Sequence, residues 1–208
     1  MKYASLDLGT VEAVFNKLGG LEGARAFLRD EQKLAPVSFE RNEHGHIVLT
    51  ITGLDLTGEE EIDRLTVAGF SVSDWAKSCM LSEKKDSYDK NHRLVAGVEY
   101  KISLMPTQET GRDSDRTTDA LRKRGIEKYG YKLPLAGIVP RIRESISDAR
   151  MKEMGFLYIA APHDPIKDSD GAPGVLCAGR RDDGLWPDAL WDHHDYHWHD
   201  HGAFAFLV

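Results

Sequence analysis

The residues best suited to chemistry lie close together near the carboxyl end of the chain. The ten residues from Asp192 to His201 read DHHDYHWHDH and include five histidines. Imidazole nitrogens are common protein ligands for Zn²⁺, Ni²⁺, Cu²⁺ and iron, so this density predicts a site for a divalent metal such as zinc or nickel. The candidate ligands in this run are His193, His197, His199 and His201.

The backbone conformation of this run decides which histidines could share one ion. In an extended segment alternate side chains point the same way, which groups His197, His199 and His201. In a helix His193, His197 and His201 would align instead. The alternative is a solvated polar loop between two strands that binds metal only adventitiously.

A second candidate site lies in the loop that follows residues 156–161. It carries His163, Asp164, Asp168 and Asp170. The three carboxylates could hold a hard cation, with His163 as a base or a ligand, and with the tail histidines they could form a metal-dependent hydrolase. An EF-hand is excluded because Ile166 takes the first ligand position and no Glu closes the loop. The alternative is that Asp and Gly only form turns here.

Charge is unevenly distributed along the chain, whose formal net charge is -7. Residues 112–152 contain eleven Lys or Arg against six Asp or Glu, whereas residues 162–201 contain nine Asp against three Lys or Arg. The basic region could contact a nucleic-acid backbone or an acidic partner, or it could be a solvated face. The net negative charge argues against general nucleic-acid binding.

Several classes of protein are not indicated by the sequence. It has no G-x-S-x-G, Walker A, G-x-G-x-x-G or H-E-x-x-H motif. Cys79 and Cys177 lie in apolar stretches, as buried free thiols do. No run reaches about 18 apolar residues, and residues 1–10 lack the features of a signal peptide, so we expect a cytoplasmic protein without a membrane partner. Whether it is an enzyme stays open, and the leading interpretation is a non-catalytic protein whose His/Asp-rich surface binds a metal, a small ligand or a protein partner.

The elements that must position these residues are short. Apolar residues at helical spacing in residues 10–18 and 21–28, separated by Gly19-Gly20, predict an N-terminal helical hairpin within residues 1–31. Thr57 and Glu60 have the spacing of a capping box before a helix at 58–68, and Ser73 can cap the next helix. Residues 82–93 are expected to form a loop.

Strands and helices alternate irregularly through the rest of the chain. Strands are predicted at 46–53, 97–105, 156–161, 175–178 and 203–207. Helices are predicted at 117–129, despite Gly125, and at 135–146 with a kink or late start at Pro140, and a further helix begins at Ser147-Asp148. This order predicts an α+β fold with a mixed or antiparallel sheet, formed as one domain over residues 1–208 with the hairpin packed on the body.

Four segments together resemble a widespread family of uncharacterised bacterial proteins. They are VEAVFNKLGGLEGARAFLRDE (11–31), LTGEEEIDRLTVAGFSVSDWAK (56–77), HDPIKDSDG (163–171) and GAFAFLV (202–208). The resemblance spans nearly the whole chain. It implies a bacterial origin and transfers no activity and no catalytic residue.

The carboxyl end is also similar to another class of sequence. RRDDGLWPDALWDHHDYHWHDHGAFAFLV (180–208) resembles the C-terminal variable regions of diversity-generating retroelement target proteins. Nine of the ten residues from Asp192 to His201 are Asp, His or Tyr, whose codons all have adenine in the middle. This resemblance implies a diversified ligand-binding surface on a C-type-lectin-like scaffold.

Overall fold

The computed structural model describes residues 11, 15, 18, 20–29, 39–181, 184–192 and 195–208. The chain divides into two compact units, Met1–Ser38 and Phe39–Val208. In the first unit, helix α2 (Gly20–Leu28) confirms the second half of the predicted hairpin, and its Leu21, Phe27 and Leu28 are exposed. The predicted helix at 10–18 falls mostly outside the described residues. The packing of the hairpin on the body stays a prediction.

The second unit is built on a mixed sheet, which confirms the predicted α+β class. Seven strands of its described residues take part, in the order β1-β2-β7-β3-β5-β4, and β6 pairs with β5. Every pairing is antiparallel except that of β3 with β7. The strands are β1 (Ile47–Thr52), β2 (Glu99–Pro106), β3 (Tyr158–Ala160), β4 (Ile166–Lys167), β5 (Pro173–Arg181), β6 (Gly184–Trp191) and β7 (Gly202–Leu207).

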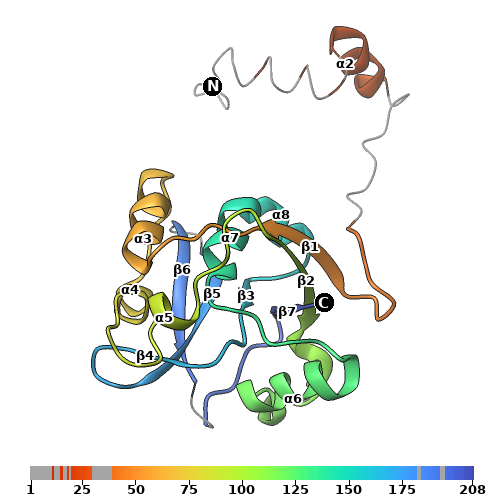
Figure 1. Cartoon of the computed structure of the whole chain (residues 1–208). Helices are drawn as coiled ribbons and strands as arrows, with labels where there is room; N and C mark the ends of the chain where they lie inside the picture. Colours follow the sequence, from red (N-terminus) through yellow and green to blue (C-terminus); the bar gives the residue numbers. More distant parts are fainter. Residues whose placement is uncertain are drawn as a thin grey trace. The chain divides into compact units, whose positions relative to one another are not determined.

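Helices cover both faces of this sheet, and Figure 1 shows α6 and α7 on opposite sides of it. The helices of the second unit are α3 (Gly58–Val67), α4 (Asp74–Met80), α5 (Tyr88–Asn91), α6 (Thr118–Tyr129), α7 (Ile138–Ser145) and α8 (Asp148–Glu153), with 3₁₀ turns η1 (Thr107–Thr110) and η2 (Asp113–Asp115). None of the helices in the described part of the chain is long and apolar enough to cross a membrane.

The alternation of side chains along the strands divides the core into two clusters. In β7, Ala203 and Ala205 face the larger cluster with α3, α4 and α7, whereas Phe204 and Phe206 face the smaller cluster with α6. Because successive strand residues point to opposite faces, the central strands are apolar on both sides. β3 has neighbours on both edges, as the apolar segment 156–161 predicts. Cys79 and Cys177 are both buried, as expected, and form no disulfide with each other.

Local signals set the ends of the helices. The capping box of Thr57 and Glu60 is present, and Ser73 accepts a hydrogen bond from the Ala76 N–H. Pro140 lies in the first turn of α7, so that helix has the predicted late start. Three elements were not predicted: α5, which lies in the expected loop, the two-residue β4, and β6.

The sequence did not predict β6, because Pro187 and Asp188 interrupt its apolar residues. It pairs with β5 along one edge, and proline is tolerated in an edge strand because its missing N–H is not needed for the ladder. The Pro187 carbonyl accepts a hydrogen bond from Ser73, which ties the start of α4 to this strand.

Gly125 allows α6 to approach the sheet closely. A Cβ at this position would lie 2.4–2.8 Å from ring carbons of Phe206, which is fully buried and has no room to move. We predict that Gly125→Ala lowers the free energy of unfolding by about 1–3 kcal/mol, although alanine favours a helix over glycine by about 1 kcal/mol. Urea denaturation measures this, with Lys123→Ala on the exposed side of α6 as the control, expected within about 0.5 kcal/mol of the parent. A more stable Gly125→Ala protein would contradict the packing.

Candidate functional site

A buried tryptophan holds the His/Asp-rich segment, residues 192–201, against the sheet. Trp198 is 1% exposed, and its Nε1–H donates to the Thr118 hydroxyl at 3.0 Å. Its backbone N–H donates to the Arg116 carbonyl at 2.8 Å. Its ring contacts those of Tyr158, Tyr196 and Phe204 at centroid distances of 5.1–5.4 Å. Sequence reasoning gave this residue no role, although it is the one tryptophan of the run.

The three histidines of this segment that the structure describes point away from the core. The side chains of His197, His199 and His201 are exposed, whereas the His199 carbonyl accepts hydrogen bonds from Thr107 and Tyr158. His193 lies outside the described residues. Among the residues that the structure describes, no group of three or more His, Cys, Asp or Glu is arranged to hold a metal ion. The metal site therefore stays a prediction without support from the described part of the segment.

His163 is a core residue with both ring nitrogens already engaged. Its Nδ1–H donates to the Asp164 carbonyl at 2.6 Å, and its Nε2 accepts the Leu176 N–H at 2.9 Å. Burial, with His92 nearby, lowers the pKa of His163 to about 3, so the ring is neutral at physiological pH. In this arrangement His163 has no nitrogen left for a metal or for proton transfer.

The carboxylates of the same loop support the turn interpretation. Asp168 is buried, and its Oδ1 accepts hydrogen bonds from the N–H groups of Asp170 at 3.0 Å and Ala172 at 2.8 Å. These contacts form the tight connection between β4 and β5. The side chains of Asp164 and Asp170 are exposed. A hard-cation site on these residues gains no support from their geometry.

The two predicted segments meet at Arg122. Its Nε–H donates to the Pro162 carbonyl at 3.1 Å, and its Nη1 lies 2.9 Å from an Asp192 carboxylate oxygen. The His163 carbonyl accepts from the same guanidinium. The Arg122 guanidinium thus links the first residues of both segments, while the His163 ring points into the core.

Most cations of the basic region are already paired. Nine of the eleven Lys and Arg residues between 112 and 152 have a carboxylate within 4.0 Å. The exceptions in this fully described stretch are Lys132 and Lys152. Paired cations offer little net charge to phosphates, so the nucleic-acid interpretation gains no support here.

The His/Asp-rich segment does contribute to a pocket through Asp200. We call this hollow, of about 260 Å³, the Asp200 pocket. Its polar lining comes from Arg41, His46, Gln108 and Asp200, and its apolar lining includes the buried Leu104 and Phe156. Arg41 precedes β1, Gln108 lies in η1 and Asp200 precedes β7, so the pocket is assembled from segments far apart in the sequence.

A network of hydrogen bonds fixes His46 in the pocket wall. Glu109 Oε1 lies 3.4 Å from His46 Nε2, and His46 Nδ1 lies 2.8 Å from the Tyr131 hydroxyl. Because an ionised carboxylate only accepts, Nε2 carries the hydrogen and Tyr131 donates to Nδ1. Tyr131 accepts in turn from Asn42 at 2.6 Å. The imidazole is therefore a neutral, immobile surface.

Two side chains of this network, His46 and Glu109, have lowered pKa values. Burial lowers the pKa of His46, which keeps the ring neutral. Burial alone would raise the pKa of Glu109, but hydrogen bonds from Tyr129, His46 and Arg124 lower it to about 2. No sequence pattern pointed to this network, because His46, Glu109 and Tyr131 lie far apart along the chain.

Arg41 and Asp200 carry opposite charges in the same pocket without neutralising one another. Arg41 Nη1 donates to the Gly45 carbonyl at 2.6 Å, and the Asp200 carboxylate lies 3.4 Å from His201 Nε2. Among the described residues, Arg41 is in no ion pair with a carboxylate. The pocket can therefore present a cation and an anion to one small ligand.

No family model, curated protein or solved structure matches this chain. The resemblances to an uncharacterised bacterial family and to retroelement variable regions stay predictions.

The buried neutral state of His163 predicts how stability depends on pH. In the unfolded chain a histidine has a pKa near 6.5, so as pH falls from about 6.5 towards 3 the unfolded state takes up a proton that the folded state excludes. The free energy of unfolding should fall by up to about 1.4 kcal/mol per pH unit from this group. His163→Gln should remove that slope in urea denaturation between about pH 7 and pH 4.

The control is His201→Gln, because that ring is largely exposed. A difference in unfolding free energy between His163→Gln and the parent that stays constant over this pH range would contradict the neutral buried ring.

Proposed function

We propose that this chain is a binding protein for a small zwitterion, such as a free amino acid, held in the Asp200 pocket. The observation that carries the proposal is that Arg41 and Asp200 line one hollow without pairing with each other. A ligand with a carboxylate and an ammonium group can satisfy both charges at once. A ligand with a single charge would leave the other pocket residue to water.

The size and rigidity of the pocket support a ligand of this class. Its volume of about 260 Å³ is just below the usual range of about 300–1,000 Å³ for small-molecule sites, which favours a compact molecule. His46 is held by Glu109 and Tyr131, so this part of the pocket lining does not have to be ordered on binding. Leu104 and Phe156 add apolar lining that can contact an aliphatic side chain.

The pocket supports binding better than catalysis. Among the described residues that line it, the one titratable ring is His46, whose two nitrogens are engaged by Glu109 and Tyr131. Tyr131 is itself buried among Asn42 and Ser103, so a proton passed along this chain would reach no bound substrate. In this proposal the His/Asp-rich segment places Asp200 in the pocket and does not bind a metal.

Binding can be tested with matched ligands. Thermal-shift measurements with each of the twenty common amino acids identify the tightest binder, and calorimetry then compares it with its deaminated and its decarboxylated analogues. We predict that each analogue binds at least about 10-fold more weakly, because a charge-assisted hydrogen bond contributes about 1.5–3 kcal/mol. Arg41→Gln and Asp200→Asn should each cause a similar loss.

Two substitutions serve as matched controls. Arg112→Gln and Asp170→Asn remove the same charges from exposed positions outside the pocket and should leave the affinity unchanged. The proposal fails if no amino acid binds at about 10 mM, or if a singly charged analogue binds as tightly as its parent.

A further inference from the structure

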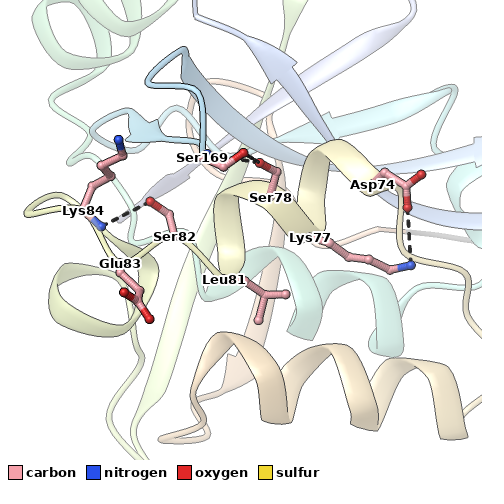
Figure 2. A pocket seen from close by; sticks show the side chains of 8 residues that line it. All are labelled: Asp74, Lys77, Ser78, Leu81, Ser82, Glu83, Lys84 and Ser169. Atoms are coloured by element: carbon pink, nitrogen blue, oxygen red, sulfur yellow. Dashed lines mark hydrogen bonds and ion pairs between the residues drawn. The ribbon is translucent and has the colours of Figure 1, made fainter.

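A larger hollow lies beside α4, away from the residues of the Asp200 pocket. It encloses about 670 Å³ between the last turn of α4, the residues that follow it and the β4–β5 turn, which contributes Ser169. Figure 2 shows the Ser78 and Ser169 hydroxyls close together on one side, with Lys77 and Lys84 on either side of them. The loop predicted to hold a cation through its aspartates thus presents a hydroxyl group to this hollow.

The pair formed by Ser78 and Ser169 has one hydroxyl hydrogen that the pair itself does not use. The Ser78 and Ser169 hydroxyl oxygens lie 3.0 Å apart, and Ser78 Oγ also accepts the Ser169 N–H at 3.2 Å. One of the two hydroxyl hydrogens is used between them, whichever residue donates. The other is available to an acceptor in the hollow. Ser82 differs, because its hydroxyl donates to the Lys167 carbonyl at 2.6 Å.

The two lysines add positive charge that is only partly compensated. Lys77 lies 3.6 Å from an Asp74 carboxylate oxygen, but Asp74 is fully exposed and such surface pairs are weak. Lys84 is in no ion pair among the described residues. In Figure 2 the Glu83 carboxylate and the Lys84 ammonium lie on opposite sides of their loop, so Glu83 does not neutralise the charge of Lys84.

The loop that carries Lys84 is already held in place. Lys90 Nζ donates to the carbonyls of Glu83 at 2.8 Å and Lys84 at 3.1 Å. The backbone N–H of Lys84 lies 3.4 Å from Ser82 Oγ. These contacts fix the backbone of the loop before a ligand arrives, which lowers the entropy cost of binding.

We propose that this hollow binds a small phosphate monoester, with its phosphoryl group between Ser78, Ser169 and Lys84. A phosphoryl group carries several acceptor oxygens and close to two negative charges at pH 7, which match a spare hydroxyl donor and two ammonium groups. The side chain of Leu81, 52% exposed at the edge of the hollow, offers an apolar surface to the organic part of the ester. This site shares no residue with the Asp200 pocket.

The proposal is tested with phenyl phosphate as the probe, by ³¹P line broadening and calorimetry on the full chain. Lys84→Gln should weaken binding by about 10-fold, and Ser169→Ala by a smaller factor of about 3 to 10. Asp74→Asn should strengthen binding, because it frees Lys77 from its partner. This opposite direction is not expected from a variant that merely damages the fold.

Two controls complete the experiment. Lys152→Gln removes an exposed, unpaired cation outside the hollow and should leave binding unchanged. Phenol should bind far more weakly than phenyl phosphate if the phosphoryl group is recognised. The proposal is overturned if phenyl phosphate causes no broadening, if phenol binds as tightly, or if Lys84→Gln and Lys152→Gln have equal effects.

Discussion

The last strand of the chain lies in the middle of the sheet, and the arrangement of the carboxyl-terminal half depends on this. β7 is hydrogen-bonded to β2 along one edge and to β3 along the other, and residues 203–206 are fully buried. β7 therefore joins the β1–β2 pair to β3 and the strands beyond it. Because β6 and β7 run in the same direction, the connection between them crosses one face of the sheet, where Trp198 belongs to the smaller core cluster. The position of Asp200 beside Arg41 and His46 follows from this path.

The His and Asp residues that the sequence singled out for chemistry have different roles in this structure. His163 and Asp168 are buried, and a buried polar group must find partners inside the protein, so each satisfies backbone N–H groups of neighbouring segments. His197 and His199 are exposed, and it is the His199 backbone carbonyl that accepts the hydrogen bonds from Thr107 and Tyr158. Such an arrangement uses polar side chains as structural links at buried positions. Arg41 and Asp200 instead line one hollow, where we propose that they bind a ligand.

Elements defined by local patterns were predictable from the sequence, whereas those defined by distant partners were not. The Thr57–Glu60 capping box, the strand at residues 97–105 and the late start at Pro140 are local, and the structure confirms each. β6 depends on pairing with β5, and α5 depends on burying Tyr88 in the main core, so their own residues give a weak signal. The same holds for the pockets. In the proposed site Asp200 acts together with Arg41, which lies about 160 positions earlier in the chain, and no spacing rule joins the two residues.

The central claim is that the ligand contacts residues from both ends of this unit in one pocket. The most direct measurement is a map of amide chemical-shift changes in the ¹⁵N-labelled chain during titration with its tightest-binding amino acid. The account predicts saturable changes at Arg41, Gly155 and Asp200 with a common affinity. Changes confined to His197 and His199, or changes that never include Arg41, would contradict it.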